Sequence, residues 1–133
     1  MATLQDQGVR ELLTDPNYAV VSTLNSDGSV HSTVVWISLD GDSVALNSAL
    51  GRRWPTNLQR DPRVTILVYE TGDPYEYVEI RGRARATREG ADEHIDALSK
   101  KYTGHDEFQG RKPGDERVKF VIEPERLRYK TER

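Results

Sequence analysis

The sequence contains no cysteine among its 133 residues. Disulfide bonds, thiol chemistry and thiolate metal sites are therefore excluded. Basic residues are not in excess, because 19 Lys and Arg face 22 Asp and Glu, for a formal net charge of −3. A chain-wide positive field of the kind that binds nucleic acid is thus absent. The three histidines, His31, His94 and His105, are scattered and lack the spacing of metal ligands.

Long apolar runs are also missing, and none approaches the length of a membrane-spanning helix. The first residues, MATLQDQGVRELL, lack the basic and apolar regions of a signal peptide. A Walker loop, a Rossmann fingerprint and a Gly-x-Ser-x-Gly elbow are absent as well. We therefore expect a soluble, cytoplasmic protein with one domain over residues 1–133, long enough to bury a core.

Most of the chain is patterned as short strands, which lie at residues 18–24, 30–39, 43–47, 64–69, 77–87, 118–122 and 127–129. Helical spacing is found after Thr3, which can act as a cap, and over residues 89–102. His94 lies on the acidic side of the second helix, so we expect it in solvent. A long polar loop follows at 103–116. These elements predict an all-β fold, a closed or nearly closed antiparallel barrel with flanking helices, and a sandwich is the alternative.

Two strand patterns carry further expectations. The alternation after Val30 predicts that Thr33 and Val35 share one face, available to a ligand, whereas Val34 packs against protein on the other. In the strand at 77–87, one face ends in small residues around Gly82, which indicates close approach of another element or a bend at a barrel corner.

The stretch 49–63, ALGRRWPTNLQRDPR, carries the strongest sign of chemistry. Gly51 can take a positive φ, and Pro55 suits the first turn of a short helix while driving Trp54 into an extended conformation. Arg52 and Arg53 place two guanidiniums beside that helix N-terminus, an arrangement that favours an anion and phosphate in particular. The alternative is a surface turn with solvated arginines.

Several segments together resemble a known family: NSDG (25–28) with the strand through Trp36, GRRWPTNLQRDPRV (51–64), YEYVEIRGRA (75–84), ADEHIDALSKKY (91–102) and IEPERL (122–127). Their order resembles the pyridoxamine 5′-phosphate oxidase-like split barrels, and among them the coenzyme F420-dependent (deazaflavin) oxidoreductases of actinobacterial type. The resemblance implies a split β-barrel and a homodimer that holds a flavin-like cofactor in a cleft at the subunit interface.

The resemblance also implies which residues contact the cofactor: His31, Ser32, Thr33, Val34 and Val35 on a strand, then Asn47, Ser48, Ala49, Gly51, Arg52, Arg53 and Trp54 around the phosphate, with Asn57 on the following helix. Many relatives place a lysine where this chain has Trp54, so the phosphate would lose one point charge. Either Arg53 substitutes for that lysine or the cofactor binds more weakly.

The function implied by the resemblance is an oxidoreductase in which reduced F420 passes a hydride to an organic acceptor. The cofactor supplies that chemistry, and the protein supplies binding and orientation. One alternative is the same fold with FMN, and another is a non-catalytic cofactor-binding dimer. A barrel that binds single-stranded nucleic acid is disfavoured by the negative charge. No catalytic side chain and no acceptor are predicted.

Overall fold

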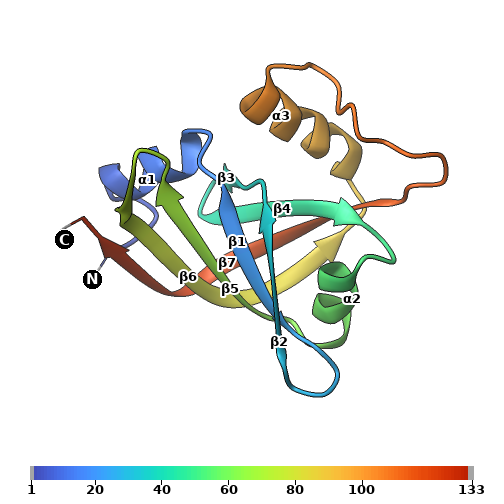
Figure 1. Cartoon of the computed structure of the whole chain (residues 1–133), viewed down its shortest axis with the longest axis horizontal. Helices are drawn as coiled ribbons and strands as arrows, with labels where there is room; N and C mark the ends of the chain where they lie inside the picture. Colours follow the sequence, from blue (N-terminus) through green and yellow to red (C-terminus); the bar gives the residue numbers. More distant parts are fainter. Residues whose placement is uncertain (1, 132–133) are drawn as a thin grey trace.

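The structure is a computed structural model that describes residues 2–131, and a seven-stranded sheet with three helices makes up most of it (Figure 1). The strands are β1 (Ala19–Leu24), β2 (Val30–Val35), β3 (Ser38–Asp40), β4 (Ser43–Ala49), β5 (Arg63–Glu70), β6 (Asp73–Thr87) and β7 (Arg117–Lys130). The helices are α1 (Gln7–Thr14), α2 (Arg53–Arg60) and α3 (Ala91–Thr103).

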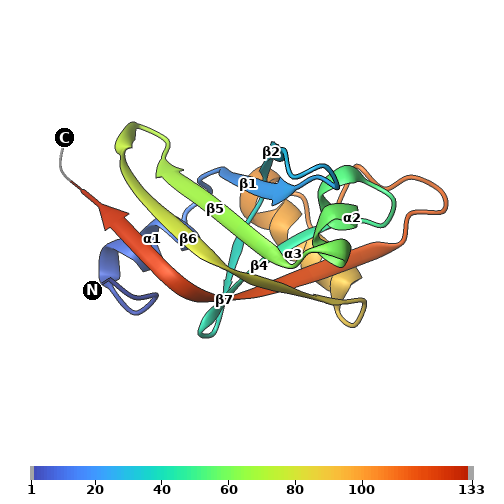
Figure 2. The same ribbon diagram turned by 90° about the horizontal axis from the view of Figure 1, so that it is seen from below.

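The strands pair in the order β2-β1-β5-β6-β7-β4-β3, and every neighbouring pair is antiparallel. The predicted mainly-β antiparallel fold with flanking helices is therefore confirmed. Figure 2 shows how strongly the sheet curls, with the long β6 and β7 running beside one another. Within residues 2–131, the edge strands β2 and β3 do not pair with each other, so the sheet is not closed by hydrogen bonds and its description as a barrel stays a prediction.

The predicted strand at 30–39 is divided into β2 and β3, with the break at Trp36 and Ile37. The backbone of Ile37 is satisfied by side chains of α3 instead of a neighbouring strand. Its N–H donates to the hydroxyl of Tyr102 at 3.2 Å, and its carbonyl accepts from Nζ of Lys101 at 2.6 Å. Because these contacts come from a helix far away in the sequence, the local alternation could not predict the break.

Conversely, the two strands predicted at 118–122 and 127–129 form one continuous strand, β7. A register shift accommodates Pro124, since Arg81 pairs with Arg126 while Gly82 pairs with Pro124. The close approach predicted at Gly82 is confirmed, because a Cβ there would lie 2.6 Å from the carbonyl oxygen of Glu123. The bulge bends the long β6–β7 ribbon without interrupting it.

The helix boundaries also differ from the prediction. Helix α1 begins at Gln7 with Asp6 as its N-cap, because residues 3–6 form a separate turn closed by a hydrogen bond from the Asp6 N–H to the Thr3 carbonyl. Helix α2 includes Trp54, which was expected to be extended. Burial of that indole overrides the preference of a residue before proline, as only 6% of Trp54 is exposed.

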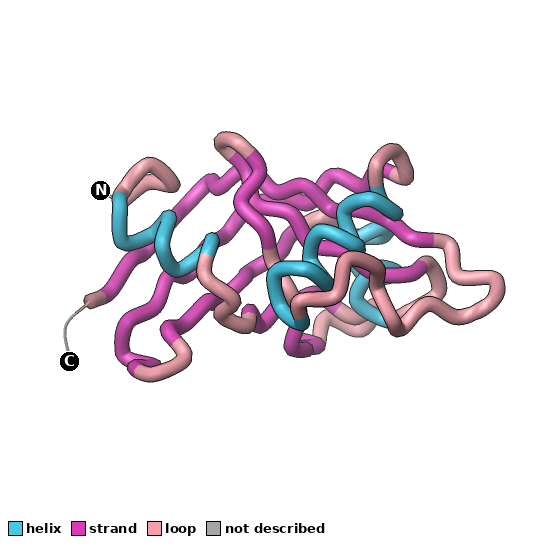
Figure 3. The backbone as a smooth tube through the Cα atoms, turned by 90° about the horizontal axis from the view of Figure 1, so that it is seen from above, coloured by secondary structure: helices cyan, strands magenta, loops and turns pink. Residues whose placement is uncertain are grey.

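The core lies between the curled sheet and the helices, with α1 at one end and α2 and α3 toward the other (Figure 3). Its largest fully buried side chains include Phe120, Ile66 and Ile80 from the central strands. No helix among the described residues is long and apolar enough to cross a membrane. The arrangement leaves a hollow where β2, β4, α2 and α3 meet.

Candidate functional site

A cavity of about 430 Å³ occupies that hollow and is covered by α3 and the loop that follows it. Its lining residues are Tyr18, His31, Thr33, Val34, Val35, Trp36, Asn47, Ser48, Arg52, Arg53, Trp54, Ile95, Leu98, Phe108 and Arg117. Separate parts of the chain, from Tyr18 to Arg117, thus converge on one space. It combines an aliphatic and aromatic wall with an end that carries arginines.

The cavity brings together nine of the thirteen residues that the sequence predicted to contact a cofactor: His31, Thr33, Val34, Val35, Asn47, Ser48, Arg52, Arg53 and Trp54. Ser32 is not among the lining residues and hydrogen-bonds Oγ of Ser22 at 2.8 Å. Ala49 is buried, and Gly51 and Asn57 line a neighbouring cavity beneath the 25–28 turn. A contact between any of these residues and a cofactor stays a prediction.

The alternation of β2 is confirmed, since His31, Thr33 and Val35 are half-buried while the residues between them are exposed. The expectation that Val34 packs against protein is wrong for the single chain, where 64% of this residue is exposed. Strand β2 is an edge strand, so no further strand covers that side. Thr33 and Val35 nevertheless line the cavity, as predicted for a ligand-facing wall.

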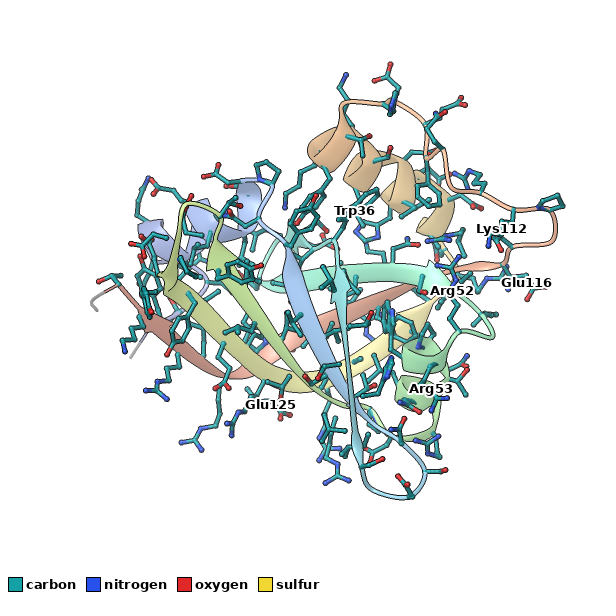
Figure 4. All side chains as sticks on the ribbon, viewed as in Figure 1. Trp36, Arg52, Arg53, Lys112, Glu116 and Glu125 are labelled. Atoms are coloured by element: carbon teal, nitrogen blue, oxygen red, sulfur yellow. The ribbon has the colours of Figure 1, made fainter. Side chains whose placement is uncertain are left out.

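The loop before α2 has the predicted positive φ at its glycine, but its extended residue is Arg52 and not Trp54. Gly51 has a φ of +96°, and Arg52 is the N-cap of α2 in an extended conformation. The helix ends at Arg60, directly before the predicted stop at Asp61. Both Arg52 and Arg53 are exposed and line the cavity, so the N-terminal end of α2 and two guanidiniums meet there. Figure 4 shows Arg52 near the adjoining ends of β4 and β7, and Arg53 on α2.

The most informative residue of the site is Arg117, which the sequence did not single out. Only 4% of it is exposed, and Nε and Nη2 both donate to Oδ1 of Asn47, at 3.1 and 2.8 Å. Its guanidinium lies 5.1 Å from the ring centroid of Phe108, and Nη1 has no hydrogen-bond partner among the described residues. Burial lowers the pKa of Arg117, and the positive charge of Arg52 lowers it further.

Arg117 was missed because its neighbours in the sequence look like the end of a polar loop. The register of the sheet brings it to the site, since Arg117 pairs with Ala49 directly before the arginine loop. The N–H of Leu50 also bonds the carbonyl of Glu116, at 2.9 Å. No local pattern in the sequence signals this pairing between segments nearly seventy residues apart.

Aromatic side chains form the part of the lining next to Arg117. The ring of Trp36 stacks on Tyr102 with centroids 5.3 Å apart and planes only 6° from parallel. Phe108 meets Trp36 edge-on at 6.0 Å. Trp54 instead packs into the core against Phe120, with centroids 5.3 Å apart. Trp36 is therefore a fixed aromatic wall, while Trp54 is chiefly a packing anchor.

The expectation that His94 is solvated is wrong. Its Nε2 lies 2.8 Å from Oγ of Ser38, and its Nδ1 lies 3.1 Å from Nδ2 of Asn47. Burial lowers the pKa of His94 to about 4, with a smaller contribution from the charge of Lys119. His94 is therefore neutral at physiological pH. No group of three or more His, Asp or Glu in the described part of the chain could hold a metal ion.

Comparison with known proteins identifies the family. Residues 5–131 match the pyridoxamine 5′-phosphate oxidase family, which is nearly the whole chain. The chain belongs to the pyridoxamine 5′-phosphate oxidase family. Proteins with this fold bind flavin-type cofactors, which agrees with a cavity that has an aromatic wall and an arginine end. No curated protein showed significant similarity to the sequence.

Solved structures support the same fold for this family member. An F420 reductase is 25% identical over 92% of this chain and 98% of its own, with a TM-score of 0.79. The conserved hypothetical protein Rv2991 from Mycobacterium tuberculosis is 22% identical over 95% and 84% of the two chains, with a TM-score of 0.75. General Stress Protein 26 from Bacillus anthracis is 17% identical over 93% and 92%, with a TM-score of 0.70. The last two similarities concern the fold alone.

Proposed function

We propose that this protein is an F420-dependent oxidoreductase that transfers a hydride between the deazaflavin cofactor and an organic acceptor. The observation that carries the proposal is one cavity whose lining combines apolar and aromatic side chains with arginines. Residues of β2 and the stacked Trp36 form an apolar wall, and Arg52 and Arg117 supply positive charge. A planar ring joined to a phosphate needs both kinds of surface at once. The similarity to a solved F420 reductase supports this cofactor.

The residues present fit such a group. Thr33 and Val35 would lie along the ring, and Arg52 with the N–H groups at the start of α2 would hold the phosphate. Ile95 and Leu98 of α3 line the cavity with aliphatic side chains, which would limit water at a bound ring. The bound cofactor supplies the hydride chemistry, and the chain orients it. FMN, which carries a phosphate on a similar ring, is the alternative cofactor.

We also propose that the working form is a homodimer with the cofactor at the subunit interface. Val30 and Val34 are 63% and 64% exposed on the edge strand β2. An uncovered edge strand with β-branched side chains favours association with another chain. The cavity lies beside this strand, so a second copy bound there would complete its wall.

Separate titrations with F420 and FMN, followed by fluorescence, test the proposal. We expect F420 to bind more tightly than FMN and its reduced form to be consumed when a suitable organic acceptor is added. Tighter binding of FMN would assign the site to the flavin instead. Binding without turnover over a broad acceptor panel would indicate a non-catalytic cofactor-binding dimer. Failure of both cofactors to bind would remove the proposed function.

A further inference from the structure

The side-chain amide of Asn47 is engaged at both ends, and this fixes its orientation. Its oxygen accepts two hydrogen bonds from Arg117, while Nδ2 donates to the carbonyl of Ala91 at 2.9 Å and to Nδ1 of His94 at 3.1 Å. A guanidinium can only donate hydrogen bonds, so the oxygen of Asn47 has to face it. If the Asn47 amide were flipped by 180°, its NH₂ group would face the N–H groups of the Arg117 guanidinium, and neither could accept a hydrogen bond.

The orientation of Asn47 determines the tautomer of His94. Because the amide nitrogen donates to Nδ1, that ring nitrogen is an acceptor and carries no proton. The proton of the neutral imidazole is therefore on Nε2, from which it is donated to Oγ of Ser38 at 2.8 Å. Arg117 is thus held in place by a chain of neutral groups from β3, α3 and β4.

With a neutral support, the charge of Arg117 is compensated only by a long ion pair. The nearest carboxylate oxygen, on Asp115, lies 4.0 Å from Nη1, beyond hydrogen-bonding distance. Arg111 does not relieve this, because it is itself cationic and paired with Asp92 and Asp96 at 2.9 Å each. A buried guanidinium with an unused N–H is unfavourable without an anionic partner. Arg117 also lines the cavity, which is where such a partner can reach it.

The second cation of the site, beside Arg117, is Arg52 and not Arg53. The charge of Arg52 lowers the pKa of Arg117 more than the charge of Arg111 does, and both Arg52 and Arg117 line the cavity. Arg53 also lines the neighbouring cavity beneath the turn at residues 25–28. There it adds to the hydrogen bonds from Ser29 that lower the pKa of Asp27. Arg53 thus also borders the second cavity, whereas the strand pairing of β4 with β7 brings Arg117 beside the loop of Arg52.

We propose that Arg52 and Arg117 form a two-armed clamp for the phosphate of the bound cofactor, and that Asn47 and His94 position the Arg117 arm. The choice of ligand rests on the proposed function, whereas the clamp itself would hold any oxyanion of similar size. Arg53 lies outside the clamp. The sequence alone suggests a different arrangement, in which the adjacent Arg52 and Arg53 bind the phosphate together.

Four variants test the clamp by fluorescence titration with F420 and with FMN at low salt. We expect Arg52→Ala and Arg117→Lys to weaken binding about tenfold to a hundredfold, the range for a charge-assisted hydrogen bond. Arg117→Lys keeps the charge but loses the planar fork. Arg53→Ala should weaken binding less than about threefold. Arg128→Lys is the matched control, since Arg128 is exposed on the same strand as Arg117 and should have no effect.

Asn47→Asp keeps an oxygen that accepts from Arg117, but it places a carboxylate against the guanidinium and removes the donor to Ala91 and His94. We expect this variant to bind the cofactor as weakly as Arg117→Lys, because the new ion pair competes with the phosphate. Unchanged affinity in both Asn47→Asp and Arg117→Lys, with Arg53→Ala as damaging as Arg52→Ala, would overturn the clamp. The proposed function would then still stand, because the cofactor would still bind.

An independent measurement uses inorganic phosphate and the NMR signal of the Arg117 Nε–H. We expect phosphate to shift this signal in the unmodified protein. In Arg52→Ala, the phosphate concentration that gives half of the full shift should be at least about tenfold higher. If this holds but neither F420 nor FMN binds, the clamp is supported and the proposed function fails. A signal that phosphate does not move, in protein that binds F420, would contradict the clamp alone.

Discussion

Asn47 donates a hydrogen bond to Nδ1 of His94 across 3.1 Å, and through it α3 is connected to the arginine end of the cavity. The same amide accepts two hydrogen bonds from Arg117. Protonation of His94 would add a proton to Nδ1, which would then face the N–H groups of the Asn47 amide. The hydrogen bond from Asn47 to Nδ1 therefore exists only with the neutral imidazole. The position of a buried cation therefore depends on the charge state of a histidine on another element.

Stability should fall in acid because of this histidine. The pKa of His94 is about 4 in the folded chain against an ordinary 6.5, so the unfolded chain binds more protons between these values. The contribution is fully present above about pH 6.5 and is lost as the pH falls toward 4, by at most about 3 kcal/mol. Urea unfolding from pH 4 to 7.5 measures it.

His94→Asn should be less stable than the unmodified protein at pH 7.5, and the difference should shrink toward pH 4. His105→Asn is the control, because His105 is exposed in the loop after α3 and should leave the pH profile unchanged. Parallel pH profiles for the unmodified protein and His94→Asn would show that the imidazole is not buried as described.

Replacing Trp54 by lysine should damage the fold. Trp54 is 6% exposed and packs on Phe120, and loss of a buried tryptophan costs about 3–5 kcal/mol. Trp54→Lys should therefore lower the melting temperature without tightening cofactor binding. Trp54→Phe, which keeps an aromatic ring there, should lose less. Tighter, salt-sensitive F420 binding by a stably folded Trp54→Lys would instead show that this position faces the phosphate.

Lys101 should stabilise the fold by attaching α3 to the rest of the protein. Its Nζ donates to the carbonyl of Leu13 at 2.5 Å and to that of Ile37 at 2.6 Å, joining α3 to α1 and to the break after β2. Lys101→Met should lower the free energy of unfolding by about 1–3 kcal/mol, because these carbonyls lose their donor. The adjacent Lys100 pairs with Asp106 on the surface, so Lys100→Met should change it by less than about 1 kcal/mol. Equal effects of the two variants would contradict this role.

The exposed edge of β2 should control assembly. Val34→Glu places a charge on the uncovered strand, where 64% of Val34 is exposed in the single chain. We expect the unmodified protein to sediment as a dimer and this variant as a folded monomer with weaker cofactor binding. Gln59→Glu, at an exposed position near the end of α2, is a control for added charge. A monomeric unmodified protein in saturating cofactor would contradict the proposed dimer.

The sequence by itself determined the local features of this protein. The glycines at turns predicted Gly51 and Gly28 with positive φ, because few other residues adopt that conformation, and both have it. Period-two alternation placed Thr33 and Val35 on the cavity side of β2, and 3.6-residue spacing located α3. These patterns depend on a few neighbouring residues, so they can be interpreted without knowledge of the rest of the chain.

Only the tertiary structure decided which distant residues meet. The register of β4 with β7 brings Arg117 beside the loop of Arg52, and packing of α3 buries His94 against Asn47. The same packing holds the break between β2 and β3 at Ile37, where a strand pattern alone predicted continuation. Strand register and helix docking are set by the sum of many contacts across the core, and no single stretch of sequence encodes that sum.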